Sequence, residues 1–220
     1  MSTQREAELA CQDALLDSGT DTAAHAFRVT HSSSVPDWRT EDALFQALYK
    51  EFTFGLDAAA TLANRKTPRY FGPDHPKPER RDALTVPYWK VASGNLPIFC
   101  NPPSSREEGL SLAPWLAKFV EQAALGCTIV AVVPHKTSTS WWSLVRRAQE
   151  IREIPHRVKF WLLEDELAII NAARAARAEG SKRRIKSGDS AGFDSAVVVF
   201  RPQPGVIQPA CPRVVTWSYR

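Results

Sequence analysis

Cysteine is scarce in this 220-residue sequence, and its four copies stand far apart. Cys11, Cys100, Cys127 and Cys211 form no CxxC pair, and neither they nor the five histidines have the spacing of metal ligands. Disulfide frameworks and structural zinc sites need such spacing, so we expect neither disulfides nor a bound metal. Cys100 and Cys127 lie in apolar segments, where a free cysteine acts as a small core residue.

Long apolar runs are also missing. The longest extends from residue 127 to residue 133, far short of the roughly 20 residues that span a bilayer as a helix. The first ten residues mix charges with alanine and contain no apolar segment of a signal peptide, so we expect a cytoplasmic protein. With 44% apolar and 24% charged residues, the chain can bury the core of one globular domain.

Positive charge is concentrated in the later part of the chain. Residues 1–64 carry 4 Lys/Arg against 10 Asp/Glu, whereas residues 65–220 carry 24 against 14. The densest basic stretch lies between residues 146 and 186. Such a stretch is typical of a phosphate-binding face, and equally of a solvated helix followed by a surface loop.

Alternating strand and helix patterns predict an α/β fold with a parallel sheet. Thr40 can cap the first helix, and Ser111 and Gly126 can begin and end the second. Prolines and charges predict irregular structure between residues 63 and 93. The expected strands are 52–57, 96–100, 127–133, 156–162 and 193–201, and the expected helices are 41–50, 112–126, 138–151 and 163–179.

The tripeptide Asn101-Pro102-Pro103 follows a buried strand directly, where open α/β sheets bind their ligands. An Asn side-chain oxygen and the carbonyl of the first Pro can accept the two N–H bonds of a planar amine and aim its lone pair at an electrophile. Two prolines restrict the backbone and keep these acceptors in place. The pattern indicates group transfer to an amine, although the same tripeptide also occurs as a plain strand-ending turn.

Further motifs, in a fixed order, place the tripeptide in a family. Over about residues 31–201 the chain resembles the phage-encoded DNA N-6-adenine methyltransferases, the Dam-like proteins of bacteriophages and prophages. The matching motifs are Trp38 with Thr40, FTFGLDAAAT around Asp57, PRYF at 68–71, Asp82 to Leu84 with Trp89, IFCNPPS at 98–104, Trp115 with Lys118, VVPHKTSTSWW at 132–142, HRVKF at 156–160 and SAVVVF at 195–200.

The resemblance implies a fold and a reaction. The fold would be a reduced Rossmann-like S-adenosylmethionine-dependent methyltransferase with a mostly parallel sheet and flanking helices. The enzyme would methylate the 6-amino group of an adenine flipped out of duplex DNA, for a phage that masks its DNA from restriction. The chain would divide into an N-terminal extension (1–30), a methyltransferase domain (31–201) with a basic helical insert at about 163–190, and a Pro-rich tail (202–220).

The resemblance also implies roles for individual residues. Asn101, Pro102 and Pro103 would hold the target amine. Asp57, Ala58 and Ala59 would line the methionine end of the cofactor, with Asp82 as a further candidate, although an Asp at a strand end can equally be a loop cap. The expected phosphate contacts are Lys136, Arg157, Lys159, Arg174, Arg177, Lys182, Arg183, Arg184 and Lys186.

Ser104 departs from the family pattern, which usually has an aromatic residue there to stack on the flipped base. Trp115, Trp141 or Tyr70 could take that place in the base pocket, although Trp141 also suits the core and rim of a helix. Alternatively the target is another planar amine, such as the cytosine 4-amino group, an RNA base or a protein glutamine, or the chain is a catalytically weak DNA-binding relative.

Overall fold

The computed structural model describes residues 39–103, 111–161, 168, 171–172, 186, 193–202 and 212–220. The N-terminal extension, Trp38, Ser104 and most of the basic insert, including Arg174, Arg177, Lys182, Arg183 and Arg184, lie outside the described residues. The expectations for these residues, and the division of the chain into three parts, stay predictions.

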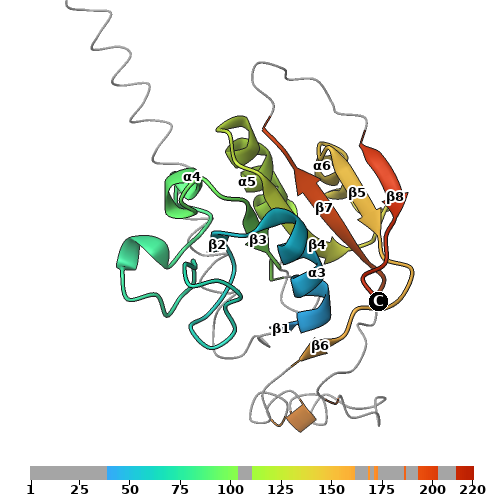
Figure 1. Ribbon diagram of the computed structural model, residues 1–220, viewed down its shortest axis with the longest axis horizontal. Helices are drawn as coiled ribbons and strands as arrows, with labels where there is room; N and C mark the ends of the chain where they lie inside the picture. The colour runs from blue at the N-terminus through green and yellow to red at the C-terminus, as the bar shows by residue number, and fades with distance from the viewer. Residues whose placement is uncertain are drawn as a thin grey trace, which may run out of the picture.

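A six-stranded sheet forms the centre of the described structure (Figure 1). Five strands run in one direction, and β7 runs against its neighbours β4 and β5. The predicted α/β class with a parallel core is therefore confirmed in its coarse form. In spatial order the strands are β2 (Leu56–Asp57), β3 (Ile98–Cys100), β4 (Ile129–Pro134), β7 (Ser195–Phe200), β5 (Glu150–Glu153) and β8 (Arg213–Thr216).

The central strands are covered on both faces, which explains their continuous apolar sequences. Every residue of β3, β4 and β7 is buried. Successive residues of β4 enter two different hydrophobic clusters, because side chains alternate between the faces of a strand. Ile129 and Val133 belong to one cluster, and Val130 and Val132 belong to the other.

Helices from different parts of the chain cover the two faces (Figure 1). Helix α3 (Asp42–Phe52) buries Leu44, Phe45 and Leu48 against the face with Val130. Helices α5 (Ala113–Ala124) and α6 (Trp142–Val145) pack on the opposite face. In the described part of the chain, no helix has both the length and the apolar character needed to cross a membrane.

Helix α5 ends at its predicted signal, but its cap position is Leu112 and not the predicted Ser111, and the predicted cap of α3 is wrong. The Ser111 hydroxyl accepts a hydrogen bond from the Ala113 amide at 3.1 Å, and Gly126, just beyond the helix, has a φ of 92°. Thr40 belongs instead to the short strand β1 (Arg39–Thr40), and Glu41 precedes α3 without a side-chain capping bond. Thr40 is drawn into β1 because that strand has a partner, described next.

The prediction of a strand of the main sheet at residues 156–162 is wrong. Their strand β6 (Phe160–Trp161) pairs antiparallel with β1 in a separate two-stranded sheet. Strand β5, whose first residues belong to the predicted helix 138–151, lies in the central sheet instead. The helical prediction holds only for the single turn of α6, because β5 gains backbone hydrogen bonds from β7 and β8 on its two sides.

Two remaining segments complete the described fold. Residues 63–93 are mostly turns, as predicted, with the short helices η1 (Pro78–Arg80) and α4 (Trp89–Ala92). Strand β8, near the end of the chain, pairs parallel with β5 and so extends the sheet into the segment expected to be a tail. Cys100 and Cys127 are free and buried, as predicted for core residues.

Candidate functional site

The carboxyl ends of β2 and β3 bring Asp57 and Asn101 to the same edge of the sheet. The two strands are parallel neighbours, and Asp57 pairs in register with Phe99. The Ala58 amide donates to the Phe99 carbonyl at 2.9 Å, which holds the two strand ends together. Asn101 follows β3 directly, so the sheet brings it to the same edge as Asp57.

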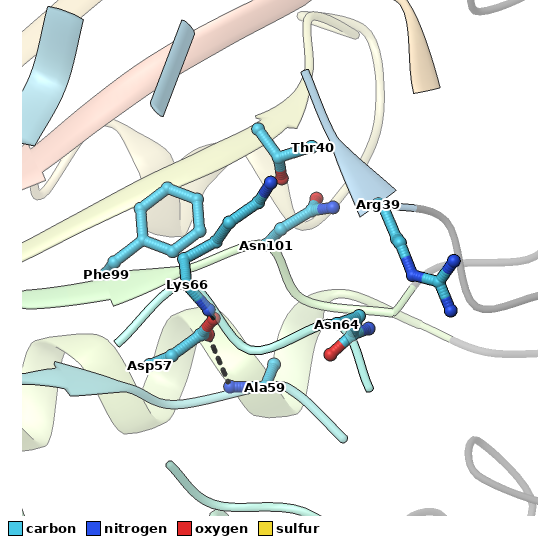
Figure 2. Close-up of a pocket in the computed structure, with 8 residues that line it drawn as sticks. All are labelled: Arg39, Thr40, Asp57, Ala59, Asn64, Lys66, Phe99 and Asn101. Atoms are coloured by element: carbon cyan, nitrogen blue, oxygen red, sulfur yellow. Dashed lines mark hydrogen bonds between the residues drawn. The ribbon is translucent and has the colours of Figure 1, made fainter. Parts of the chain in front are cut away.

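A pocket opens at this edge (Figure 2). About 220 Å³ of space, part of it open to solvent, lies between its walls. The pocket is lined by Arg39, Thr40, Asp57, Ala59, Asn64, Lys66, Phe99 and Asn101.

Asp57 is 3% exposed and organises the loop that forms one wall of the pocket. Its Oδ2 accepts a hydrogen bond from the Lys66 amide at 2.9 Å, and its Oδ1 accepts one from the Ala59 amide at 3.4 Å. The carboxylate therefore caps the loop, as one interpretation of the sequence has it, and also lines the pocket. Both roles are available to one carboxylate because its two oxygens offer about four acceptor positions.

Lys66 and Asn64 reach the pocket from the same loop, and sequence reasoning missed both. The Asn64 side-chain oxygen accepts a hydrogen bond from the Thr61 amide at 2.6 Å. The Lys66 ammonium pairs with Asp42 at the start of α3; the Lys66 side chain is 15% exposed and that of Asp42 is 88% exposed. Residues of an irregular loop follow no periodic pattern, so only their closeness in sequence to Asp57 could have marked them.

The Asn-Pro-Pro tripeptide lies where the sequence predicts it, at the end of a buried strand. Pro102 is buried, and Asn101 and Pro103 are partly buried. Figure 2 draws the side chains of Asp57, Lys66 and Asn101 turned into the same space. A pocket with a carboxylate, an ammonium and a primary amide can bind both a cationic and an anionic group of one ligand.

Asp82 lies outside this pocket. Its Oδ1 accepts a hydrogen bond from the Leu84 amide at 2.9 Å, while its Oδ2 is buried without a hydrogen bond from any described residue. Burial raises the pKa of this carboxyl. Asp82 is therefore a polar group away from the pocket, and its suggested contact with the cofactor stays a prediction.

The three aromatic candidates for the base pocket do not line this pocket, although Tyr70 forms a parallel β-bridge with Asp57. Tyr70 is 3% exposed, its ring packs on His75, and burial together with Asp74 raises the pKa of its hydroxyl. Trp115 is 2% exposed inside the core on the α5 face, and Trp141 packs partly buried on the same core. None of the three lines the pocket that contains Asn101.

Four of the expected phosphate contacts are described. The Lys136 ammonium lies 5.0 Å from the centre of the Phe193 ring, beyond the end of β4. Arg157, Lys159 and Lys186 are exposed. Within the described residues, no group of three His, Cys, Asp or Glu side chains could hold a metal ion.

Comparison with known proteins adds one finding. The family model described as DNA N-6-adenine-methyltransferase (Dam) matches residues 29–199, which include every residue of the pocket. No curated protein sequence matches the chain at a significant level.

Proposed function

Because the chain belongs to the DNA N-6-adenine-methyltransferase (Dam) family, we propose that the pocket at the ends of β2 and β3 carries out the family's reaction. The enzyme transfers a methyl group from S-adenosylmethionine to the 6-amino group of adenine in DNA. One observation carries this proposal: Asp57 and Asn101, on adjacent parallel strands, line a single pocket. The cofactor, the phage origin and the protection of phage DNA from restriction are parts of the proposal that follow from the resemblance.

The charged groups of the pocket fit the methionine end of S-adenosylmethionine. That end carries an ammonium, which needs acceptors, and a carboxylate, which needs donors. Asp57 and Asn64 offer acceptors, and Lys66 offers a cationic donor at the same pocket. When bound, the sulfonium of the cofactor makes its methyl group electrophilic.

Asn101 and Pro102 hold the target amine in this proposal. The Asn101 side-chain oxygen and the Pro102 carbonyl accept its two N–H bonds, so that the nitrogen lone pair points at the methyl carbon. A bound sulfonium donor would supply the methyl group, and the amine held by Asn101 and Pro102 would release its proton to solvent. The partial burial of Asn101 and the stiffness of two prolines support a preorganised acceptor pair.

Transfer of radiolabelled methyl from S-adenosylmethionine to unmethylated duplex DNA, followed by nucleoside analysis, tests the proposal. We expect label in N6-methyladenine with the natural chain. Asn101→Ala should lower the rate by about a hundredfold or more, because loss of aligned acceptors misplaces the amine. Gln46→Ala, which removes an exposed amide on α3, is the matched control and should leave the rate unchanged.

The nucleoside analysis also separates the alternatives. Label in methylcytosine would move the assignment to a different planar amine, an outcome kept open by Ser104, which stands where the family pattern usually has an aromatic residue. Cofactor binding without label on DNA would point to RNA or protein amides. DNA binding without measurable cofactor binding would identify a catalytically weak DNA-binding relative. Transfer that persists in Asn101→Ala would contradict the role given to the tripeptide.

A further inference from the structure

The two-stranded sheet of β1 and β6 forms part of the pocket's surroundings. Both residues of β1, Arg39 and Thr40, line the pocket together with Asn101. Strand β6 is hydrogen-bonded to β1 and lies beside it near the start of α3 (Figure 1). Strand β6 is therefore one strand away from residues that line the pocket with Asn101.

The two residues of β6 have opposite environments. Phe160 is 7% exposed and packs in the cluster beneath α3, whereas Trp161 is 48% exposed. Trp161 stands directly opposite Arg39 in the β1–β6 register. Directly opposed residues share one face of a β-ladder, so the indole lies on the same face as a residue that lines the pocket.

The segment that leads into β6 adds positive charge. The Arg157 side chain is 59% exposed, and Lys159 is also exposed. Among the described residues, Asp194 lies 4.0 Å from Arg157 in an ion pair open to solvent, which separates at little cost, and Glu41 pairs with Arg220 at 3.2 Å. An exposed indole beside two exposed cations offers stacking and phosphate neutralisation in one place, which is the chemistry of a nucleic-acid contact.

We propose that the exposed face of the β1–β6 pair binds duplex DNA beside the pocket, and that Trp161 stacks on a base next to the flipped adenine. Arg157 and Lys159 contact the adjoining phosphates. The inference rests on the function proposed above and adds to it a contact surface on a strand outside the central sheet. Stacking by the indole replaces part of the stacking that the duplex loses when the adenine leaves it.

A comparison of duplex and single-stranded DNA of one unmethylated sequence tests the role of Trp161. We expect Trp161→Ala to lower kcat/KM for the duplex about tenfold, within the range of base–aromatic stacking. The loss on the single strand should be twofold or less, because no paired base has to be unstacked there. Trp161→Phe should recover most of the duplex activity, since a phenyl ring still stacks.

Three controls separate the effect of Trp161 on DNA binding from effects on folding and on cofactor binding. Leu125→Ala removes a large side chain that is 56% exposed, just beyond α5, and should change neither substrate. S-adenosylhomocysteine affinity, measured by calorimetry, should be the same in Trp161→Ala as in the natural chain. A thermal unfolding midpoint measured for each variant reports on folding.

The salt dependence of duplex binding tests the two cations. Replacing Arg157 or Lys159 by Gln should reduce the slope of log K against log salt by about 0.9 for each lost phosphate contact. Unchanged duplex activity in Trp161→Ala, or an equal loss on duplex and single strand, would overturn the inference alone. A natural chain that binds no DNA would overturn the proposed function with it.

Discussion

At the scale of single residues, the pocket combines both signs of charge within one small space. The Lys66 ammonium is held by Asp42, whose side chain is 88% exposed. Asp42 stays hydrated without its partner, so a carboxylate that enters the pocket can replace it beside the Lys66 ammonium. Lys66 is therefore available to a carboxylate that enters the pocket.

We predict that Lys66→Met weakens the binding of S-adenosylhomocysteine about tenfold, because the carboxylate of this ligand loses a cationic donor. The affinity for 5′-methylthioadenosine, which lacks that carboxylate, should not change. Methionine keeps the apolar stem of the lysine, so the wall of the pocket keeps its shape. Calorimetric titration of both ligands into the natural chain and the variant makes the comparison.

Asp42→Asn serves as the opposite variant. It removes the competing carboxylate, so S-adenosylhomocysteine should bind equally well or a few-fold more tightly. If Lys66→Met weakened both ligands to the same extent, Lys66 would shape the pocket without binding the carboxylate.

At the scale of secondary-structure elements, an ion-pair network ties the end of α3 to β5. The Arg152 guanidinium, whose side chain is 6% exposed, donates to both Glu51 oxygens at 2.6 and 2.7 Å and to Glu150 at 3.0 Å. It also lies over the rings of Phe52 and Trp217, at 5.4 and 5.5 Å. One side chain thus joins a helix, a strand and the segment after β8.

We expect Arg152→Met to lower the free energy of unfolding by about 2 kcal/mol, because several charge-assisted hydrogen bonds are lost while Glu51 keeps access to water. Glu51→Gln should cost less, since Glu150 still accepts from Arg152. Arg157→Met, at a side chain that is 59% exposed, should stay within about 0.5 kcal/mol of the natural chain. Urea unfolding at pH 7 measures all three.

The same network predicts a pH dependence. Hydrogen bonds from Arg152 hold the pKa of Glu51 below its ordinary value in the folded protein. The unfolded chain therefore takes up a proton at higher pH than the folded one, and the stabilisation is lost as the pH falls through the folded pKa. The difference in unfolding free energy between the natural chain and Glu51→Gln should shrink from pH 7 to pH 3.5. A difference that is constant over this range would contradict the assignment.

The elements that the sequence predicts well are those decided by local pattern. Helix α5 follows its apolar spacing between Ser111 and Gly126, and the buried strands β3, β4 and β7 follow continuous apolar runs. The segment 138–151 could not be decided in this way. Its apolar residues suit a helix, but pairing with β7 and β8 makes a strand of residues 150–153.

At the scale of the whole molecule, distant segments meet at Glu41, between β1 and α3. Its carboxylate accepts hydrogen bonds from the Tyr219 hydroxyl at 2.9 Å and from the Lys159 amide at 3.3 Å, and it pairs with Arg220. Burial acts to raise the pKa of Glu41, but these partners outweigh it and lower the pKa. Burial and the bond to Glu41 raise the pKa of Tyr219 to about 12.

We predict that Tyr219→Phe lowers the free energy of unfolding by about 1 kcal/mol at pH 8, the usual value of a hydrogen bond to a partly buried group. The difference from the natural chain should narrow between pH 10 and pH 12. In that range the tyrosine of the unfolded chain ionises while the folded one keeps its proton, so the stabilisation is lost as the pH rises. Urea unfolding at pH 8 and pH 11 gives the two values.

Tyr49→Phe, which removes a hydroxyl from the exposed side of α3, is the matched control. An equal narrowing in both variants would show that the alkaline loss of stability does not come from the contact with Glu41.

The sequence by itself determined the α/β class, the main helices and buried strands, and the position of Asn-Pro-Pro at a strand end. Each of these depends on residues close together in the chain, through periodicity, caps and contiguous motifs. The family followed from the same kind of local signal, a series of short motifs in order.

Only the tertiary structure decided which segments surround the tripeptide. Asn64 and Lys66 reach the pocket from an irregular loop, and Arg39 and Thr40 reach it from β1, whose partner β6 lies about 120 residues later in the chain. The backbone groups of a short strand can pair with any available partner, so no local pattern specifies that choice. The same pairing leaves Trp161 exposed beside the pocket, because side chains alternate along a strand and the neighbouring Phe160 occupies the core.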